Sequence, residues 1–262
     1  MKRLVIQRLW IALLLASCAT AGFAQVNHAT PRAGAQLTSD FVQENLVYPD
    51  ADLQARNRGS VIISFHLDEQ GHGSEYTVKE SFSEAANENA LDIVRKILWN
   101  PATQNMLPIA SDMEYEVEYN ARAYRRYWRN HERVELPLTL EADDSYQIFE
   151  TRQLEDLAKP YFADGITMAQ YIFNNLRYPE AAKMSEVSGT VRLSFVVETN
   201  GNVSNIIVDR SVGGGCDSEA IRLLQDTHWI PAVKNGKYVR SHNMQDITFT
   251  IGSRNYQDGN SY

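Results

Sequence analysis

The sequence of 262 residues predicts an α+β protein of two tandem small domains, each a three-stranded antiparallel sheet packed by one long helix, with a short N-terminal helix. Three observations support this fold class. Tyr48-Pro49 returns as Tyr178-Pro179, an offset of 130 positions. Both halves contain segments that alternate apolar and polar residues, as strands do. Between these segments lies one with the apolar spacing of a helix. Each half therefore holds the parts of a small two-layer sandwich.

The internal repeat keeps one register through both halves, which indicates duplication of one domain. Gly59-x-Val61 returns as Gly189-x-Val191, and the glycines, prolines and aromatic residues around it follow. The recurring residues are Tyr48, Pro49, Gly59, Gly71, Trp99 and Pro101 in the first copy and Tyr178, Pro179, Gly189, Gly201, Trp229 and Pro231 in the second. The four aromatic rings among them are expected to fill the cores. We divide the chain into a signal peptide (1–24), a first domain (34–121), a connector (122–165), a second domain (166–252) and a tail (253–262).

The elements of the second copy can be placed in order along the chain. Thr167 is a helix cap, and Tyr178-Pro179 ends the helix that it begins. A short helix is expected near 181–183. Asn200-Gly201 is a hairpin signal between two strands. The strands expected are 190–198, 203–211 and 246–251, with a helix at 217–227 that Asp217 caps; the first copy has strands at 59–68, 73–81 and 113–121 and a helix at 84–98.

This ordered set of residues resembles the TonB C-terminal domain family. The second copy is the closer match, because it keeps Gly236 before its last strand where the first copy has Met106. The resemblance implies a periplasmic, non-catalytic module that binds the TonB-box strands of outer-membrane transport receptors, or another periplasmic protein. A full energy transducer of this family has a Pro-rich spacer, whereas only Pro31 lies between the expected signal peptide and the first copy. Mechanical transduction therefore requires that the N-terminal helix is kept as a membrane anchor.

An open sheet leaves an edge strand with unpaired backbone groups, and such an edge accepts a partner strand. In the first copy the candidate strand is 113–121. The same edges could pair with each other, which gives a homodimer or a self-associating structural envelope protein as the alternative. The candidate partner-binding strand of the second copy consists of Asp246, Ile247, Thr248, Phe249, Thr250 and Ile251.

The N-terminal segment is typical of a bacterial targeting signal, because Lys2, Arg3 and Arg8 precede an uncharged apolar stretch at 9–24. Cleavage before Gln25 would release the chain into the periplasm. Lipidation at Cys18 would tether it to the outer membrane, and retention of the segment would anchor it in the inner membrane. Membrane association is expected only through this segment.

Composition argues against several other classes. The formal charge of −8 disfavours nucleic-acid binding. The six histidines have no metal-ligand spacing, and no nucleophile motif is present, so neither an enzyme nor a cofactor is expected. Cys216 is either a buried inert thiol or a site for an intermolecular disulfide.

The connector carries arginines interleaved with Tyr124, Tyr127 and Trp128. We expect it to extend the third strand of the first copy, with its rings packed on the second copy. The alternative is contact with anionic lipid head groups or an acidic partner. Further on, 134–140 predicts a short strand and 151–158 a short helix.

Overall fold

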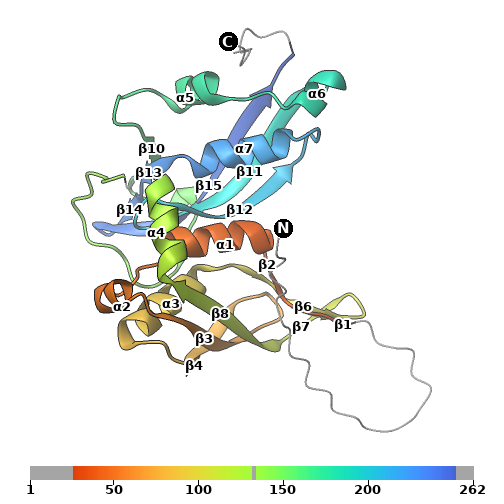
Figure 1. Cartoon of the computed structure of the whole chain (residues 1–262). Helices are drawn as coiled ribbons and strands as arrows, with labels where there is room; N and C mark the ends of the chain where they lie inside the picture. Colours follow the sequence, from red (N-terminus) through yellow and green to blue (C-terminus); the bar gives the residue numbers. More distant parts are fainter. Residues whose placement is uncertain (1–25, 132–133, 252–262) are drawn as a thin grey trace.

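A computed structural model of the chain describes residues 26–131 and 134–251 (Figure 1). It confirms the α+β class and the two tandem domains, which lie one above the other in the view of Figure 1. The expected signal peptide, the lipidation site at Cys18 and the tail lie outside the described residues. Within the described residues, no helix has both the length and the apolar character needed to span a bilayer.

The first copy has the predicted order of helices and strands. Its sheet runs β4-β3-β8, with both pairs antiparallel. Three short strands, β1, β6 and β7, make a separate small sheet, and β2 pairs with β5. The elements are β1 (Val26–Asn27), β2 (Thr30–Pro31), α1 (Gly34–Asn45), α2 (Asp50–Ala55), β3 (Arg58–Leu67), β4 (Gly73–Glu80), α3 (Glu84–Lys96), β5 (Trp99–Asn100), β6 (Ala102–Gln104), β7 (Leu107–Ile109) and β8 (Ser111–Asn120).

The second copy repeats this arrangement and extends it. Its sheet runs β12-β11-β15-β14, and β9 from the connector pairs with β15. The last strand was predicted at 246–251, but it begins nine residues earlier, at Lys237, and ends at Phe249. The elements are β9 (Ile148–Phe149), η1 (Thr151–Gln153), β10 (Lys159–Tyr161), α5 (Met168–Asn175), α6 (Glu180–Met184), β11 (Gly189–Val197), β12 (Val203–Arg210), α7 (Cys216–Gln225), β13 (His228–Ile230), β14 (Ala232–Lys234) and β15 (Lys237–Phe249).

Each copy has its own hydrophobic core between the long helix and one face of the sheet. In the first copy, alternate residues of β3 such as Val61 and Ile63 are buried against Ala90 and Ile93 of α3. The second copy packs Val191 and other residues of β11 against α7 in the same way. The period of two along the strand and of about 3.6 along the helix is what brings these apolar faces together.

The connector differs from the sequence prediction. Residues 121–130 form a helix, α4 (Ala121–Asn130), in place of a strand extension, and Asn120 caps it by accepting a hydrogen bond from the backbone N–H of Ala123. The rings of Tyr124 and Trp128 pack on the core of the first copy, not on the second copy. The segment 134–140 contains no strand, and the helix expected at 151–158 is shorter than predicted: it is the 3₁₀-helix η1, which ends at Gln153.

The start of α7 also departs from the prediction. The helix begins at Cys216, after Gly215 in a left-handed conformation, and Gly215 makes no side-chain cap. The Asp217 carboxylate instead accepts hydrogen bonds from the backbone N–H of Val212 and the hydroxyl of Ser211. Cys216 is buried, and burial raises the pKa of its thiol, as the inert alternative requires.

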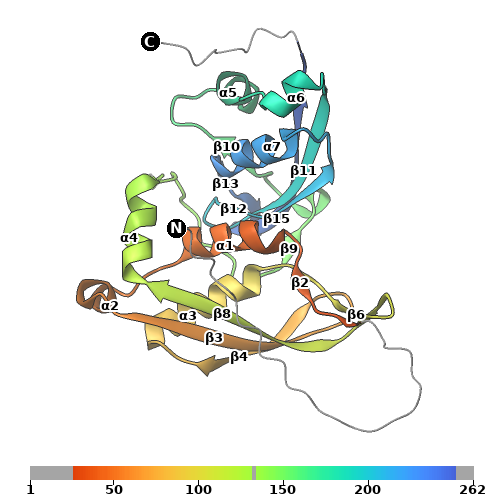
Figure 2. The ribbon, with the colours of Figure 1, turned by 45° about the vertical axis from the view of Figure 1, so that its right-hand side comes forward.

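The two copies are docked against each other. The helix α1 of the first copy lies against β12 of the second, as the two views in Figures 1 and 2 agree. Leu37 and Phe41 of α1 face Val203 and Ile206 of β12 across a small shared cavity. Residues of α1 therefore cover part of the outer side of β12.

Candidate partner-binding edge

The candidate site is the second edge of β15. Along one edge, Ser241–Phe249 pairs with β11 without a break in register. On the other edge, β9 pairs in parallel with Arg240 and Ser241. Beyond that point, no strand of the described chain occupies the outer edge of His242–Phe249. Of the predicted strand, Asp246, Ile247, Thr248 and Phe249 lie on this edge, whereas Thr250 and Ile251 follow the end of β15.

Backbone groups along this edge point away from the sheet. Tyr238 donates its backbone N–H to the carbonyl of Glu141 and accepts from the N–H of Asp143, so its groups face the connector. Backbone groups alternate sides along a strand. Those of Met244 and Asp246 therefore point to the same outer side, where an added strand would bind.

A groove runs beside the open edge. Its volume is about 470 Å³, and α5 and β15 form its walls. Phe173 in the wall of the groove is 61% exposed, and Met244 on the adjacent stretch of β15 is 63% exposed. A strand added to β15 would place alternate side chains toward the groove. The side chains that line the groove are those of Met168, Ala169, Ile172, Phe173, Leu176, Gln245, Asp246 and Thr248.

The one charge on the open stretch is compensated within the sheet. Arg192 of β11 lies opposite Asp246 and donates two hydrogen bonds to its carboxylate, each 2.7 Å long. These hydrogen bonds lower the pKa of Asp246, which stays ionised. Thr248 pairs in the same way with Thr190 through their hydroxyls. The edge thus presents a nearly neutral surface.

The corresponding edge of the first copy has different chemistry. The strand β8 pairs on one side with β3 and exposes four carboxylates on the outer face of the sheet, of which Asp112 and Glu114 pair with His66 of β3 and Lys79 of β4. Charges on an edge strand discourage strand addition. In addition, α4 lies beside α1 in this copy (Figure 2), and burial together with the nearby carboxylates of Glu44 and Asp40 raises the pKa of Tyr127 in α4. The four carboxylates belong to Asp112, Glu114, Glu116 and Glu118.

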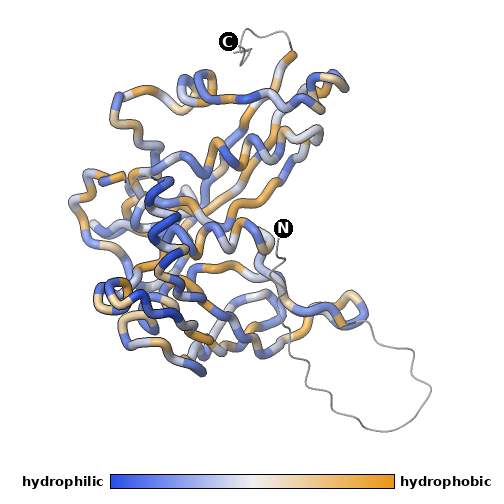
Figure 3. The backbone as a smooth tube through the Cα atoms, viewed as in Figure 1, coloured by the Kyte–Doolittle hydropathy of each residue, from blue (hydrophilic) through white to orange (hydrophobic). Residues whose placement is uncertain are grey.

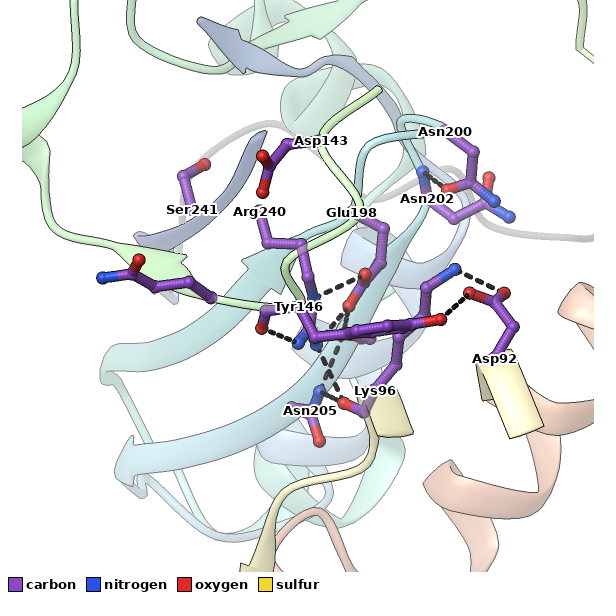
Figure 4. A network of polar contacts seen from close by, with 12 residues as sticks. Asp92, Lys96, Asp143, Tyr146, Glu198, Asn200, Asn202, Asn205, Arg240 and Ser241 are labelled. Atoms are coloured by element: carbon purple, nitrogen blue, oxygen red, sulfur yellow. Dashed lines mark hydrogen bonds and ion pairs between the residues drawn. The ribbon is translucent and has the colours of Figure 1, made fainter. Parts of the chain in front are cut away.

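A buried polar network fixes the first part of β15 (Figure 4). The Arg240 guanidinium forms an ion pair with Glu198 at 2.8 Å, and both side chains are buried. Arg240 also donates to the backbone carbonyls of Lys96, in the first copy, and Tyr146, in the connector, each at 2.8 Å. One side chain therefore joins both copies and the connector.

Asn205 supplies a second link between the copies. Its amide nitrogen donates to the Lys96 carbonyl at 2.9 Å, and its amide oxygen accepts from the backbone N–H of Leu98 at 2.8 Å. The hydroxyl of Tyr146 donates to Asp92 of α3, which also pairs with Lys96. These contacts hold the connector on β15 at Arg240 and Ser241, where β9 pairs with that strand.

The recurring aromatic residues are buried or hydrogen-bonded within their own copies, and so they stabilise the two domains. The hydroxyls of Tyr48 and Tyr178 donate to the carbonyls of Asn57 and Val187, which are themselves equivalent positions. Trp99 and Trp229 are buried.

The recurring glycines and prolines lie at close approaches and helix starts. A Cβ on Gly71 would stand 2.2 Å from the carbonyl oxygen of Trp99, and one on Gly201 would stand 2.3 Å from that of Trp229. Pro101 packs next to Gly71. Gly59 and Gly189 lie against Phe82 and Val212, Pro49 and Pro179 precede α2 and α6, and Pro231 links β13 to β14.

Sequence reasoning missed the groove and the network. Phe173 lies off the apolar face of α5 that packs on the core, so its spacing gives no signal. Glu198 and Arg240 lie 42 positions apart, and no local pattern connects them. In the described part of the chain, no group of His, Cys, Asp and Glu side chains is placed to hold a metal ion.

Comparison with known proteins identifies the family. A sequence model described as Gram-negative bacterial TonB protein C-terminal matches residues 44–121 and again residues 174–251, in the same register as the internal repeat. The chain belongs to the TonB C-terminal domain family. The two matches together cover more than half of the sequence, and both TonB C-terminal copies end where their last strands end, within two residues.

Among solved structures, the chain is similar to the solution NMR structure of the TonB C-terminal domain of Pseudomonas aeruginosa. The identity is 22%, the match covers 41% of this chain and 97% of that one, and the TM-score is 0.29. No curated protein matches the chain. Membership of the TonB family makes the chain a TonB-like, envelope-associated module connected with transport.

Proposed function

We propose that this chain is a periplasmic binding module whose second TonB C-terminal copy takes up a TonB-box-like strand of an outer-membrane transport receptor by strand addition to β15. The observation that carries the proposal is the open edge from His242 to Phe249, with its outward backbone groups beside the groove of α5. The strand would gain main-chain hydrogen bonds from the edge and side-chain selectivity from the groove.

The first copy serves as the scaffold in this proposal. Its edge strand β8 carries four exposed carboxylates, and α4 occupies the space beside α1. The second copy has a neutralised edge and a free groove beside α5. Because the copies are related by an offset of 130, Met244 on β15 corresponds to Glu114 on β8.

The experiment uses this equivalence as a matched pair. Met244→Pro removes one outward N–H from the edge of β15, and Glu114→Pro makes the same change on β8. Binding of a fluorescent TonB-box peptide is measured by polarisation, with circular dichroism to check folding. We expect Met244→Pro to weaken binding at least about tenfold, since an added strand loses a hydrogen bond and its fit to the edge. Glu114→Pro should leave the affinity unchanged.

The alternative is self-association through the same edges. Light scattering on the unmodified protein distinguishes the two. A monomer that binds the peptide supports the module. A stable dimer whose mass does not change with added peptide, or equal affinities of the two proline variants, would refute the assignment to β15.

A further inference from the structure

The helix α4 carries a stripe of arginines, hereafter the arginine face: Arg122, Arg125, Arg126 and Arg129. These positions follow the spacing i, i+3, i+4 and i+7, which places all four on one side of an α-helix within about 10 Å of its length. All four are exposed. Figure 3 shows α4 as one of the most hydrophilic segments of the molecule, and Figure 2 shows it standing at the margin.

The charges of this face are not neutralised by the rest of the described chain. Arg125 donates one hydrogen bond to the carbonyl of Leu53, and no ion pair within residues 26–131 and 134–251 involves any of the four. The carboxylates of Asp40 and Glu44 on α1 lie near Tyr127, where they add to the effect of burial in raising its pKa. Tyr127 is on the side of α4 that faces away from the four arginines. In a chain with a formal charge of −8, a concentrated basic face of this kind is a local exception.

The rings of α4 do not take part in this face. Tyr124 is buried in the core of the first copy, and Trp128 packs against the same core. The arginine face therefore offers charge without an apolar anchor. Protein interfaces depend on buried aromatic or aliphatic anchors at their centre. A layer of anionic lipid head groups requires only spread positive charge, because each basic residue near the surface adds to the attraction.

We infer that the arginine face binds the head groups of an anionic phospholipid bilayer and lays the first copy against the membrane surface. This contact is separate from the N-terminal segment and corresponds to the lipid contact that the sequence left as the alternative for the connector. It is peripheral, because Tyr124 and Trp128 pack on the core of the first copy, and it leaves the proposed binding edge of β15 in the second copy uncovered.

The test compares two triple variants with the same change of charge. Arg122→Gln/Arg126→Gln/Arg129→Gln removes three charges from the arginine face and keeps Arg125, whose hydrogen bond to Leu53 stays intact. The control, Arg152→Gln/Lys159→Gln/Lys237→Gln, removes three exposed charges elsewhere. Both are made in the chain from Gln25 onward, which retains every described element and lacks the apolar stretch at 9–24.

Binding is measured by co-sedimentation with vesicles of phosphatidylcholine containing about a third phosphatidylglycerol, and with vesicles of phosphatidylcholine alone. We expect the unmodified chain and the control to bind only the anionic vesicles, with partitioning that falls as salt shortens the Debye length from its value of about 10 Å at 0.1 M. The arginine-face variant should lose at least about tenfold in partitioning.

Three results would overturn the inference: no binding to anionic vesicles, equal binding to neutral ones, or equal loss in both triple variants. Binding to soluble polyglutamate without binding to anionic vesicles would reassign the face to an acidic protein. Thermal unfolding of each variant shows that the fold is kept.

Discussion

The link between the two copies depends on Arg240, and its removal gives the sharpest test of the docked arrangement. Arg240 is 4% exposed and Glu198 is not exposed at all. Arg240→Met leaves the Glu198 carboxylate buried without a cation and removes the donors to the carbonyls of Lys96 and Tyr146. Breaking a buried pair from one side costs about 3–5 kcal/mol, because the remaining charge stays desolvated.

The assay is the free energy of unfolding from urea titration, followed by tryptophan fluorescence. Lys79→Met is the control, since it removes one partner of the exposed ion pair Lys79–Glu114 and should cost about 1 kcal/mol or less. The double variant Glu198→Leu/Arg240→Met replaces both charges by apolar groups and should recover most of the loss, because two desolvated charges are removed together.

The reasoning fails if Arg240→Met costs no more than Lys79→Met. It also fails if the double variant is less stable than Arg240→Met alone. Either result would mean that Glu198 and Arg240 are hydrated and that the two copies are held by other contacts. A loss of stability with the expected recovery would instead show that Glu198 and Arg240 form a desolvated pair, as their burial indicates.

Two further predictions concern backbone geometry and pH. Gly71→Ala and Gly201→Ala should each lower the free energy of unfolding by at least about 2 kcal/mol, because the new Cβ would meet a tryptophan carbonyl at a position of positive φ. The control Gly213→Ala has a similar positive φ but open space around it, and should cost about 1 kcal/mol. Equal losses for the three variants in urea titration would contradict this reasoning. Burial, with a smaller contribution from Asp40, raises the pKa of Glu44 from 4.5 to about 7. Between pH 4.5 and 7 the folded chain keeps a proton on Glu44 that the unfolded chain has released. The free energy of unfolding should therefore fall as the pH rises through this range. Glu44→Gln should remove this slope and stabilise the protein at pH 8 by roughly 1–2 kcal/mol, as this side chain is only half-buried; an unchanged slope would refute the assignment to Glu44.

Much of the fold could be predicted because the local patterns and the repeat agree. The strand β3 alternates in burial, whereas β11 and β12 each contain a continuous buried run, and the sequence places β3, β4, β11 and β12 within two residues of their observed bounds. The start of β15 could not be found in this way. Residues 240–245 are mainly polar, and pairing with β11 and the bonds of Arg240, both long-range, hold them in a strand.

The connector was predicted as a strand extension, but its start forms the helix α4. Tyr and Trp favour strands, which supported an extension of β8. The arginine spacing and the capping side chain of Asn120 favour a helix, and the packing of Tyr124 on the core of the first copy decides for it. The sequence contained this signal, since the four arginines already have helical spacing. The groove beside α5 had no such signal, because it arises from two elements about 70 residues apart.

Among the longer edge strands of the described chain, β15 is the one on which the proposed strand addition meets the least obstruction. The edge of β12 is partly covered by α1, and Asn205 at that place is tied to the first copy. The strands β4 and β8 carry exposed charges, which act against strand addition. On β15, the connector occupies the edge up to Ser241, and beyond it the single charge of Asp246 is matched by Arg192. The positions that make this difference are not shared by the copies: Glu198 and Arg240 correspond to Asp68 and Ala110. The duplication has therefore produced two unequal domains, in which contacts specific to the second copy dock it on the first and leave part of its last strand open.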